Sequence, residues 1–208
     1  METPKLFEDG ILSRADAEVI LDPYMLRLAE CVFAGYDFIL DIREKYPKHY
    51  VMLSPTTRAG IVHDATVAHA SQRFKGLRPD VALVDALGSK VINFCDRIAL
   101  RFKKLSDGLK ANNIPTKQQM AFCQQTLWPD LTNVTIGYRL DATGHDIRDV
   151  QIVCWYYDEK RWNIEVPYKR EDVEDVLEPR GISIVDIPGP RVRAKLPRLD
   201  KTGTSASS

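Results

Sequence analysis

The sequence carries no excess charge of either sign, because 29 Lys and Arg residues balance 29 Asp and Glu residues. This balance excludes a histone-like polycation and an acidic solvating chain, although it leaves room for a local basic surface. Hydrophobic residues make up 44% of the 208 residues, which is ordinary for a globular protein with a packed core. Charge and composition therefore bear on the fold class and assign no activity.

Nothing in the sequence predicts a signal peptide or a membrane span. Residues 1–10 contain no apolar core behind a basic start. The longest apolar run, Val81 to Val84, is far shorter than the roughly 20 residues that cross a bilayer. The cysteines lie far apart without a CxxC pair, which favours reduced, structural thiols; they are Cys31, Cys95, Cys123 and Cys154. We therefore expect a cytoplasmic protein without membrane contacts.

The standard catalytic motifs are missing as well. The chain has no G-x-S-x-G serine motif and no glycine-rich phosphate loop of the G-x-x-x-x-G-K-[ST] or G-x-G-x-x-G kind. His63 and His69 are too far apart on a predicted helix to converge on one zinc ion, as the histidines of HExxH do. We therefore expect no resident metal or cofactor, and we favour binding over catalysis.

Helical spacing of apolar residues dominates the first part of the chain, residues 14–75. The predicted helices cover 14–21, 23–45 and 57–74. The second begins after an Asp-Pro pair that suits a helix start, and it stops before Pro47. Its apolar residues cover much of its girth, so it is either buried on two sides within its own domain or the contact of a homo-oligomer.

Beyond Pro79 the apolar residues alternate, so that region 80–166 is expected to contain two three-strand runs around one helix. The predicted strands are 81–85, 90–95, 98–104, 132–140, 147–156 and 161–166, and the helix is 117–127. Short turns between strands favour antiparallel pairing. The expected fold class is α+β, with N-terminal helices packed on a mainly antiparallel sheet in the order helices-βββ-α-βββ.

The composition changes near residue 168, so we assign residues 1–168 to a single α+β domain. Residues 169–187 form an acidic segment that is expected to contain a short helix. Residues 188–208 are basic and rich in Pro, Gly and Ser, without large apolar groups to offset the entropy of ordering. We expect this tail to be disordered.

Three cations fall on outward positions of the predicted strands. Arg101 and Lys103 alternate along strand 98–104, and Arg139 lies on strand 132–140. If these strands are neighbours, the three residues form an anion-binding surface for phosphates or for a carboxylate-rich partner. The alternative is a solvated face whose charges pair across strands.

The order of elements is similar to the core of the PD-(D/E)XK nucleases. In that alternative, Asp85 or Asp96 and Lys103 are the catalytic residues and Mg²⁺ is the metal. The E-x-K motif of those enzymes is replaced here by Arg101-Phe102-Lys103, and Arg offers donors but no acceptor for Mg²⁺. A metal-dependent nuclease, or an inactive relative, is therefore the alternative function.

Three segments, Leu100–Leu105, Asn112–Gln119 and Val134–Asp141, resemble a family of uncharacterised bacterial proteins. This family is associated with mobile elements and prophages, and the resemblance spans about residues 57–166. It implies a component of a mobile-element, phage-defence or toxin–antitoxin-type module. We expect a non-catalytic binding component that recognises an anionic ligand, a protein partner or a nucleic acid. An oligomeric scaffold, assembled through helix 23–45, is the second alternative.

Overall fold

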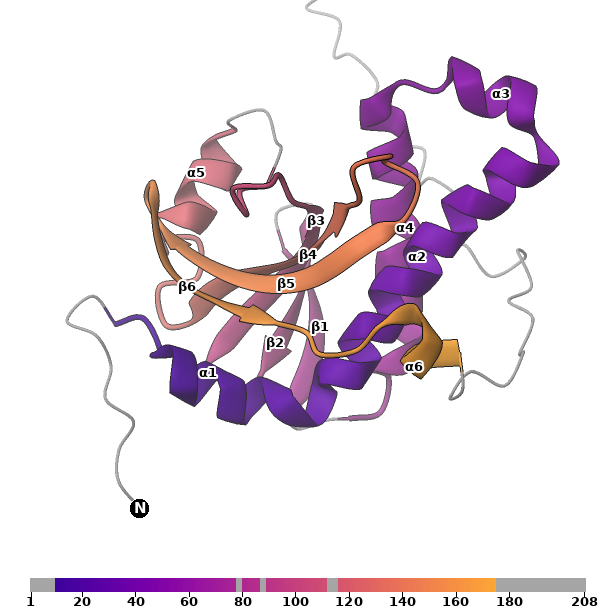
Figure 1. Ribbon diagram of the computed structural model, residues 1–208. Coiled ribbons are helices and arrows are strands. Elements are labelled where there is room, and N and C mark those ends of the chain that lie inside the picture. The colour runs from indigo at the N-terminus through magenta and orange to yellow at the C-terminus, as the bar shows by residue number, and fades with distance from the viewer. Residues whose placement is uncertain (1–9, 78–79, 87–88, 112–115, 175–208) are drawn as a thin grey trace, which may run out of the picture. The chain divides into compact units, whose positions relative to one another are not determined.

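Helices form the N-terminal part of the chain and strands the part that follows, in the predicted order (Figure 1). The computed structural model describes residues 10–77, 80–86, 89–111 and 116–174. The chain divides into two units, 1–178 and 179–208, and every described residue belongs to the first. The predicted basic tail 188–208 lies outside the described residues.

The N-terminal helices are close to their predicted positions. They are α1 (Arg14–Leu21), the 3-10 turn η1 (Asp22–Tyr24), α2 (Met25–Lys45), α3 (Pro47–Met52) and α4 (Pro55–Arg73). Ser13 and Ser54 cap α1 and α4, because each hydroxyl accepts a hydrogen bond from a backbone N–H three residues later. Pro23 lies in the short 3-10 turn rather than in the long helix, and α3 was not predicted.

The sheet has six strands in the order in which they occur along the chain. They are β1 (Val81–Ala86), β2 (Ser89–Phe94), β3 (Ile98–Lys104), β4 (Thr132–Leu140), β5 (Ile147–Tyr156) and β6 (Glu159–Glu165). Every neighbouring pair is antiparallel except β3 and β4, which are parallel. The α+β class and the mainly antiparallel sheet are thus confirmed.

One face of the sheet, which we call the helix-covered face, packs against α1, α2 and α4. Its central side chains are fully buried and apolar: Phe94, Leu100, Ile136 and Ile152. Helix α2 is in close contact with α4, since a Cβ added at Gly35 would lie 2.9 Å from the Cα of Thr66. The apolar girth of α2 is therefore buried within its own unit, and Leu28, Val32, Phe33, Tyr36 and Ile39 are among its buried residues.

The opposite face, which we call the cavity face, is covered by the connection between β3 and β4. A parallel pair requires the chain to return to the starting edge, and this return carries segment 105–111 and α5 (Lys117–Cys123) over the sheet. Leu105, Leu109 and Val153 form a second, smaller hydrophobic cluster there. Helix α5 ends earlier than the predicted Leu127, because Gln125 has a left-handed backbone with φ of 59°.

Short contacts connect the last described residues to the rest of this unit. The acidic segment begins with α6 (Arg170–Glu174), and Arg170 pairs with Asp37 of α2. Cys31 and Cys154 are buried, whereas Cys95 is exposed. Within the described part of the chain, no helix has both the length and the apolar character that a membrane span needs.

Candidate functional site

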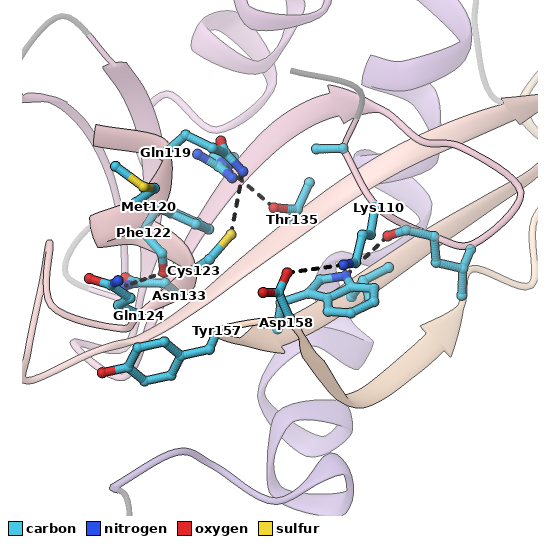
Figure 2. A pocket seen from close by; sticks show the side chains of 15 residues that line it. Lys110, Gln119, Met120, Phe122, Cys123, Gln124, Asn133, Thr135, Tyr157 and Asp158 are labelled. Carbon is cyan, nitrogen blue, oxygen red and sulfur yellow. Dashed lines mark hydrogen bonds and ion pairs between the residues drawn. The ribbon is translucent and has the colours of Figure 1, made fainter. Parts of the chain in front are cut away.

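A cavity of about 260 Å³ opens on the cavity face, between α5, segment 105–111 and strands β3 to β5 (Figure 2). We call it the α5 cavity. Arg101 and Thr135 of the sheet line it, together with Phe122 and Cys123 of α5 and Trp155 of β5. Apolar surface predominates in this lining, as it does in most small-molecule sites. The cavity therefore combines a cation with aromatic walls.

Arg101 is the charged group that the fold places in this cavity. Its side chain projects from β3 toward α5, and the residue is only 6% exposed. Nε donates a hydrogen bond of 3.2 Å to Oγ1 of Thr135, its neighbour on the parallel strand β4. The guanidinium carbon lies 3.5 Å from the centre of the Phe122 ring, which is a close cation–π contact. Both contacts hold the guanidinium in one orientation.

The charge of Arg101 has no carboxylate partner among the described residues. Its recorded interactions are with Thr135, with Phe122 and with the thiol of Cys123. Burial lowers the pKa of Arg101 to about 10, so the group is still protonated at neutral pH. A buried cation without a counter-ion is unfavourable, because its lost hydration is not replaced by an opposite charge. The α5 cavity is consequently a favourable site for an anion.

The mouth of the cavity contains a second cation, but this one is neutralised. Nζ of Lys110 lies 3.1 Å from Oδ1 of Asp158 and 5.0 Å from the centre of the Trp155 ring. The indole Nε1 donates a hydrogen bond of 3.1 Å to the carbonyl oxygen of Leu109. These contacts hold segment 105–111 against β5 and so define one wall of the cavity.

A buried glutamine fixes the end of α5 above the sheet. The side-chain oxygen of Gln125 accepts a 2.6 Å hydrogen bond from the backbone N–H of Asn133. Its amide nitrogen donates to the carbonyl oxygens of Asn133 and Trp155, at 3.0 and 2.9 Å. Sequence reasoning missed Gln125, since it lies inside the predicted helix 117–127, where a glutamine carries no recognisable signal. It joins α5 to β4 and β5 and positions Phe122 over Arg101.

The structure places the three predicted anion-binding cations on one sheet face but in different surroundings. Arg101 pairs with Thr135 and Lys103 with Gly137 in the register of β3 and β4, so their side chains share a face with Arg139. Lys103 is half-buried beside α4, where burial lowers its pKa. The three residues do not line one cavity.

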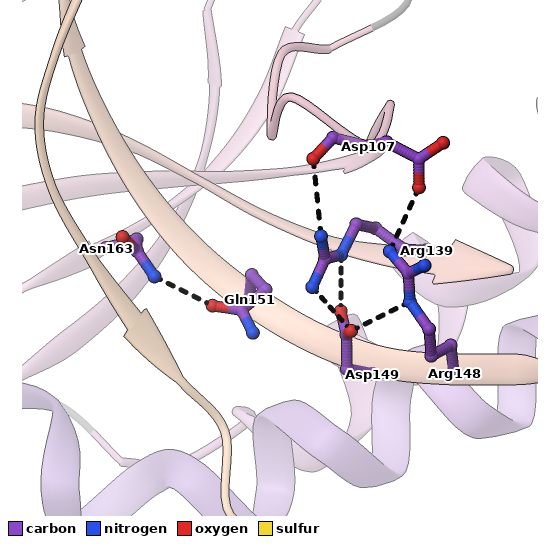
Figure 3. A network of polar contacts seen from close by, with 6 residues as sticks. All are labelled: Asp107, Arg139, Arg148, Asp149, Gln151 and Asn163. Carbon is purple, nitrogen blue, oxygen red and sulfur yellow. Dashed lines mark hydrogen bonds and ion pairs between the residues drawn. The ribbon is translucent and has the colours of Figure 1, made fainter. Parts of the chain in front are cut away.

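Arg139 belongs to a network of charges that pair across strands, as expected from the alternative to an anion-binding surface (Figure 3). Its Nε and Nη2 atoms lie 2.8 and 2.6 Å from the two carboxylate oxygens of Asp149 on β5. Arg148 contacts the same carboxylate at 3.2 Å and Asp107 at 3.0 Å. Cross-strand pairing thus describes Arg139, whereas Arg101 is buried and pairs with no carboxylate in the part of the chain that the structure describes.

The residues of the nuclease alternative are spread over the sheet. Asp96 lies in the turn before β3 and accepts a 2.7 Å hydrogen bond from Nδ2 of Asn93. Lys103 lies at the other end of β3, roughly 20 Å away along an extended strand. Asp85 is exposed on β1, opposite Lys90. Among residues 10–77, 80–86, 89–111 and 116–174, no three His, Cys, Asp or Glu side chains form a group that could hold a metal ion.

Comparisons of this chain with protein-family models, with curated proteins and with solved structures give no match. The function is therefore argued from the chemistry of the α5 cavity.

Proposed function

We propose that this protein is a non-catalytic binding protein that recognises an anionic ligand through Arg101 in the α5 cavity. The observation that carries the proposal is a protonated guanidinium, 6% exposed, that faces a cavity and pairs with no carboxylate of the described residues. An anion that enters the cavity supplies the missing counter-charge, and a charge-assisted hydrogen bond is stronger than a neutral one. Binding of this kind requires no catalytic group.

We also propose, on the resemblance of residues 57–166, that the protein is a component of a bacterial mobile-element, phage-defence or toxin–antitoxin-type module. In such a module the protein acts by binding a protein partner or a nucleic acid. The cysteines are scattered along the sequence without a CxxC pair, which suits a reducing cytoplasm, and we propose this location for the protein. Co-purification from the native host, followed by mass spectrometry, tests this part of the proposal independently of the cavity.

Cys123 and Cys95 provide a direct test of anion binding. Cys123 lines the cavity and is partly exposed, whereas Cys95 is exposed and does not line it. The purified protein is treated with iodoacetamide in the presence of acetate, benzoate, inorganic phosphate, phenyl phosphate or a short single-stranded oligonucleotide. We expect at least one of these anions to slow alkylation of Cys123 without affecting Cys95, and we expect Arg101→Met to abolish this protection.

Two substitutions separate the cavity from a wider basic face. Lys103→Gln and Arg139→Gln remove the other predicted cations, and neither residue lines the cavity. We expect both variants to keep anion protection of Cys123 within about twofold of the unmodified protein. Equal losses in all three variants would instead favour a basic surface made by Arg101, Lys103 and Arg139. Metal-dependent cleavage of plasmid or RNA, abolished by Asp96→Ala, would replace binding with the nuclease alternative.

A further inference from the structure

The ionisable groups of the α5 cavity define the charge of its ligand. The charged side chains that line the cavity are Arg101, Lys110 and Asp158. Lys110 and Asp158 neutralise each other at 3.1 Å, so among the described residues that line the cavity the positive charge of Arg101 remains. A monoanion matches that charge. A phosphate monoester, which carries close to two negative charges at neutral pH, would bring a second charge into the cavity without a partner.

The orientation of Arg101 defines which atoms the anion contacts. One edge of the guanidinium is used by the hydrogen bond from Nε to Thr135, and one of its flat sides is covered by the Phe122 ring. The thiol of Cys123 also accepts a hydrogen bond from the guanidinium. The two terminal nitrogens carry four N–H groups, so N–H groups remain for a ligand on the edge away from Thr135. Two parallel N–H groups match the two oxygens of a carboxylate, which is the bidentate geometry that Arg favours.

The walls of the cavity define the rest of the ligand. Phe122, Trp155, Val153 and Leu109 present aromatic and aliphatic surface around Arg101. The indole N–H of Trp155 is already used by Leu109, so this wall offers its ring rather than its donor. A volume of about 260 Å³ is just below the lower end, roughly 300 Å³, of the usual range for small-molecule sites. One aromatic or bicyclic ring system therefore fits inside the cavity.

We infer that the α5 cavity binds a small aromatic monocarboxylic acid, with the carboxylate on Arg101 and the ring against Trp155 and Phe122. This inference rests on the proposed function, because it names the class of anion for the same site. The carboxylate forms a bidentate ion pair inside the cavity, and the ring displaces water from the apolar walls. No covalent step is involved.

Matched probes test the inference on the unmodified protein. Benzoate, cinnamate and indole-3-acetate are the carboxylates, benzamide and cinnamamide are neutral analogues of the same shape, and phenyl phosphate is the dianion. Isothermal titration calorimetry and alkylation of Cys123 report binding, with Cys95 as the internal control. We expect at least one carboxylate to bind at least tenfold more tightly than its amide and than phenyl phosphate. No variant is needed for this comparison.

Variants then locate the contact. Arg101→Met should abolish binding of the best carboxylate, Arg101→Lys should weaken it at least tenfold, and Thr135→Val should weaken it less. Circular dichroism and thermal unfolding establish that each variant is folded. Tighter binding of phenyl phosphate or of an oligonucleotide, lost in Arg101→Met, would overturn the ligand class and keep the proposed function. If none of the anions binds or protects Cys123 in the folded protein, both the class and the proposed function are wrong.

Discussion

The two faces of the sheet differ in what their buried residues do, and Leu100 and Arg101 illustrate this difference from adjacent positions on β3. Leu100 is fully buried against the helices, in a core whose central sheet residues are apolar. Arg101, on the cavity face, is almost as well buried but is charged and lies against a cavity. Burial alone therefore does not identify a structural residue, because it covers apolar side chains on one face and a charged side chain on the other.

The buried polar residues of the cavity face show the same contrast. Asn133, Thr135 and Gln151 are at most 5% exposed, yet hydrogen bonds involve each of them. Gln151, for example, accepts a 3.1 Å hydrogen bond from Asn163 of the neighbouring strand (Figure 3). Arg101 differs from these groups because a hydrogen bond to a hydroxyl does not neutralise its charge. Arg101 is thus a buried charge on this face without a carboxylate partner among the described residues, and the proposed binding site depends on this feature.

The largest expected changes in unfolding free energy and in anion binding distinguish Leu100→Ala from Arg101→Met. Leu100→Ala removes buried methyl groups and leaves a cavity in the helix-covered face, which costs about 3 kcal/mol of unfolding free energy. Arg101→Met keeps the length of the side chain and removes a desolvated charge, so we expect a change within about 1 kcal/mol. Urea unfolding measures both. Anion protection of Cys123 should follow the opposite order, surviving in folded Leu100→Ala and disappearing in Arg101→Met.

The next largest change in unfolding free energy is expected in the helix layer, where two glycines form a matched pair. A Cβ at Gly35 would overlap Thr66, whereas a Cβ at Gly60 of α4 meets no atom within 4 Å. Gly35→Ala should therefore separate α2 from α4 and lower the unfolding free energy by about 2 kcal/mol. Gly60→Ala should raise it by roughly 0.5 kcal/mol, because alanine is the better helix former. Equal stabilities in urea unfolding would contradict the close contact of α2 and α4.

A smaller contribution to stability is expected from the ion pair of Arg139 with Asp149 on the cavity face. Arg139 and Asp149 are 20% and 14% exposed in their side chains and form a two-pronged pair. A double-mutant cycle with Arg139→Met and Asp149→Asn should give a coupling energy of about 1 kcal/mol. The coupling should fall in high salt only slightly, since the pair is mostly buried. Anion protection of Cys123 should not change, and a large loss would extend the site beyond the α5 cavity.

Strand alternation was sufficient to predict β3, β4 and β5 at their observed bounds, because period-two patterns depend only on local geometry. It also predicted that Arg101 and Lys103 share a face. It did not predict the burial of Arg101, because alternation identifies a face but not what covers it. That cover is α5, whose position depends on the parallel return from β3 to β4 and on the hydrogen bonds of Gln125. These contacts join residues distant in sequence, and no local pattern encodes them.

The last and smallest expected effect is a dependence of stability on pH, which arises at His63, where α4 meets the end of β3. Burial first, and then the positive charge of Lys103, lower the pKa of His63, while Asp64 and a backbone hydrogen bond with Phe102 oppose this shift. The unfolded chain therefore binds a proton near pH 6.5 that the folded chain resists, so stability falls as the pH drops below about 6.5.

Urea unfolding between pH 5 and pH 8 measures this dependence on pH. Burial also lowers the pKa of His69, so His63→Gln should reduce the slope without removing it. His49 is exposed on α3, away from the contact of α4 with β3, so His49→Gln is the control substitution. A slope that is the same in His63→Gln as in the unmodified protein would show that His63 is not desolvated. The boundary between the helix layer and the charged end of β3 would then be open to water, and the contrast between the two faces would not extend to this end of the sheet.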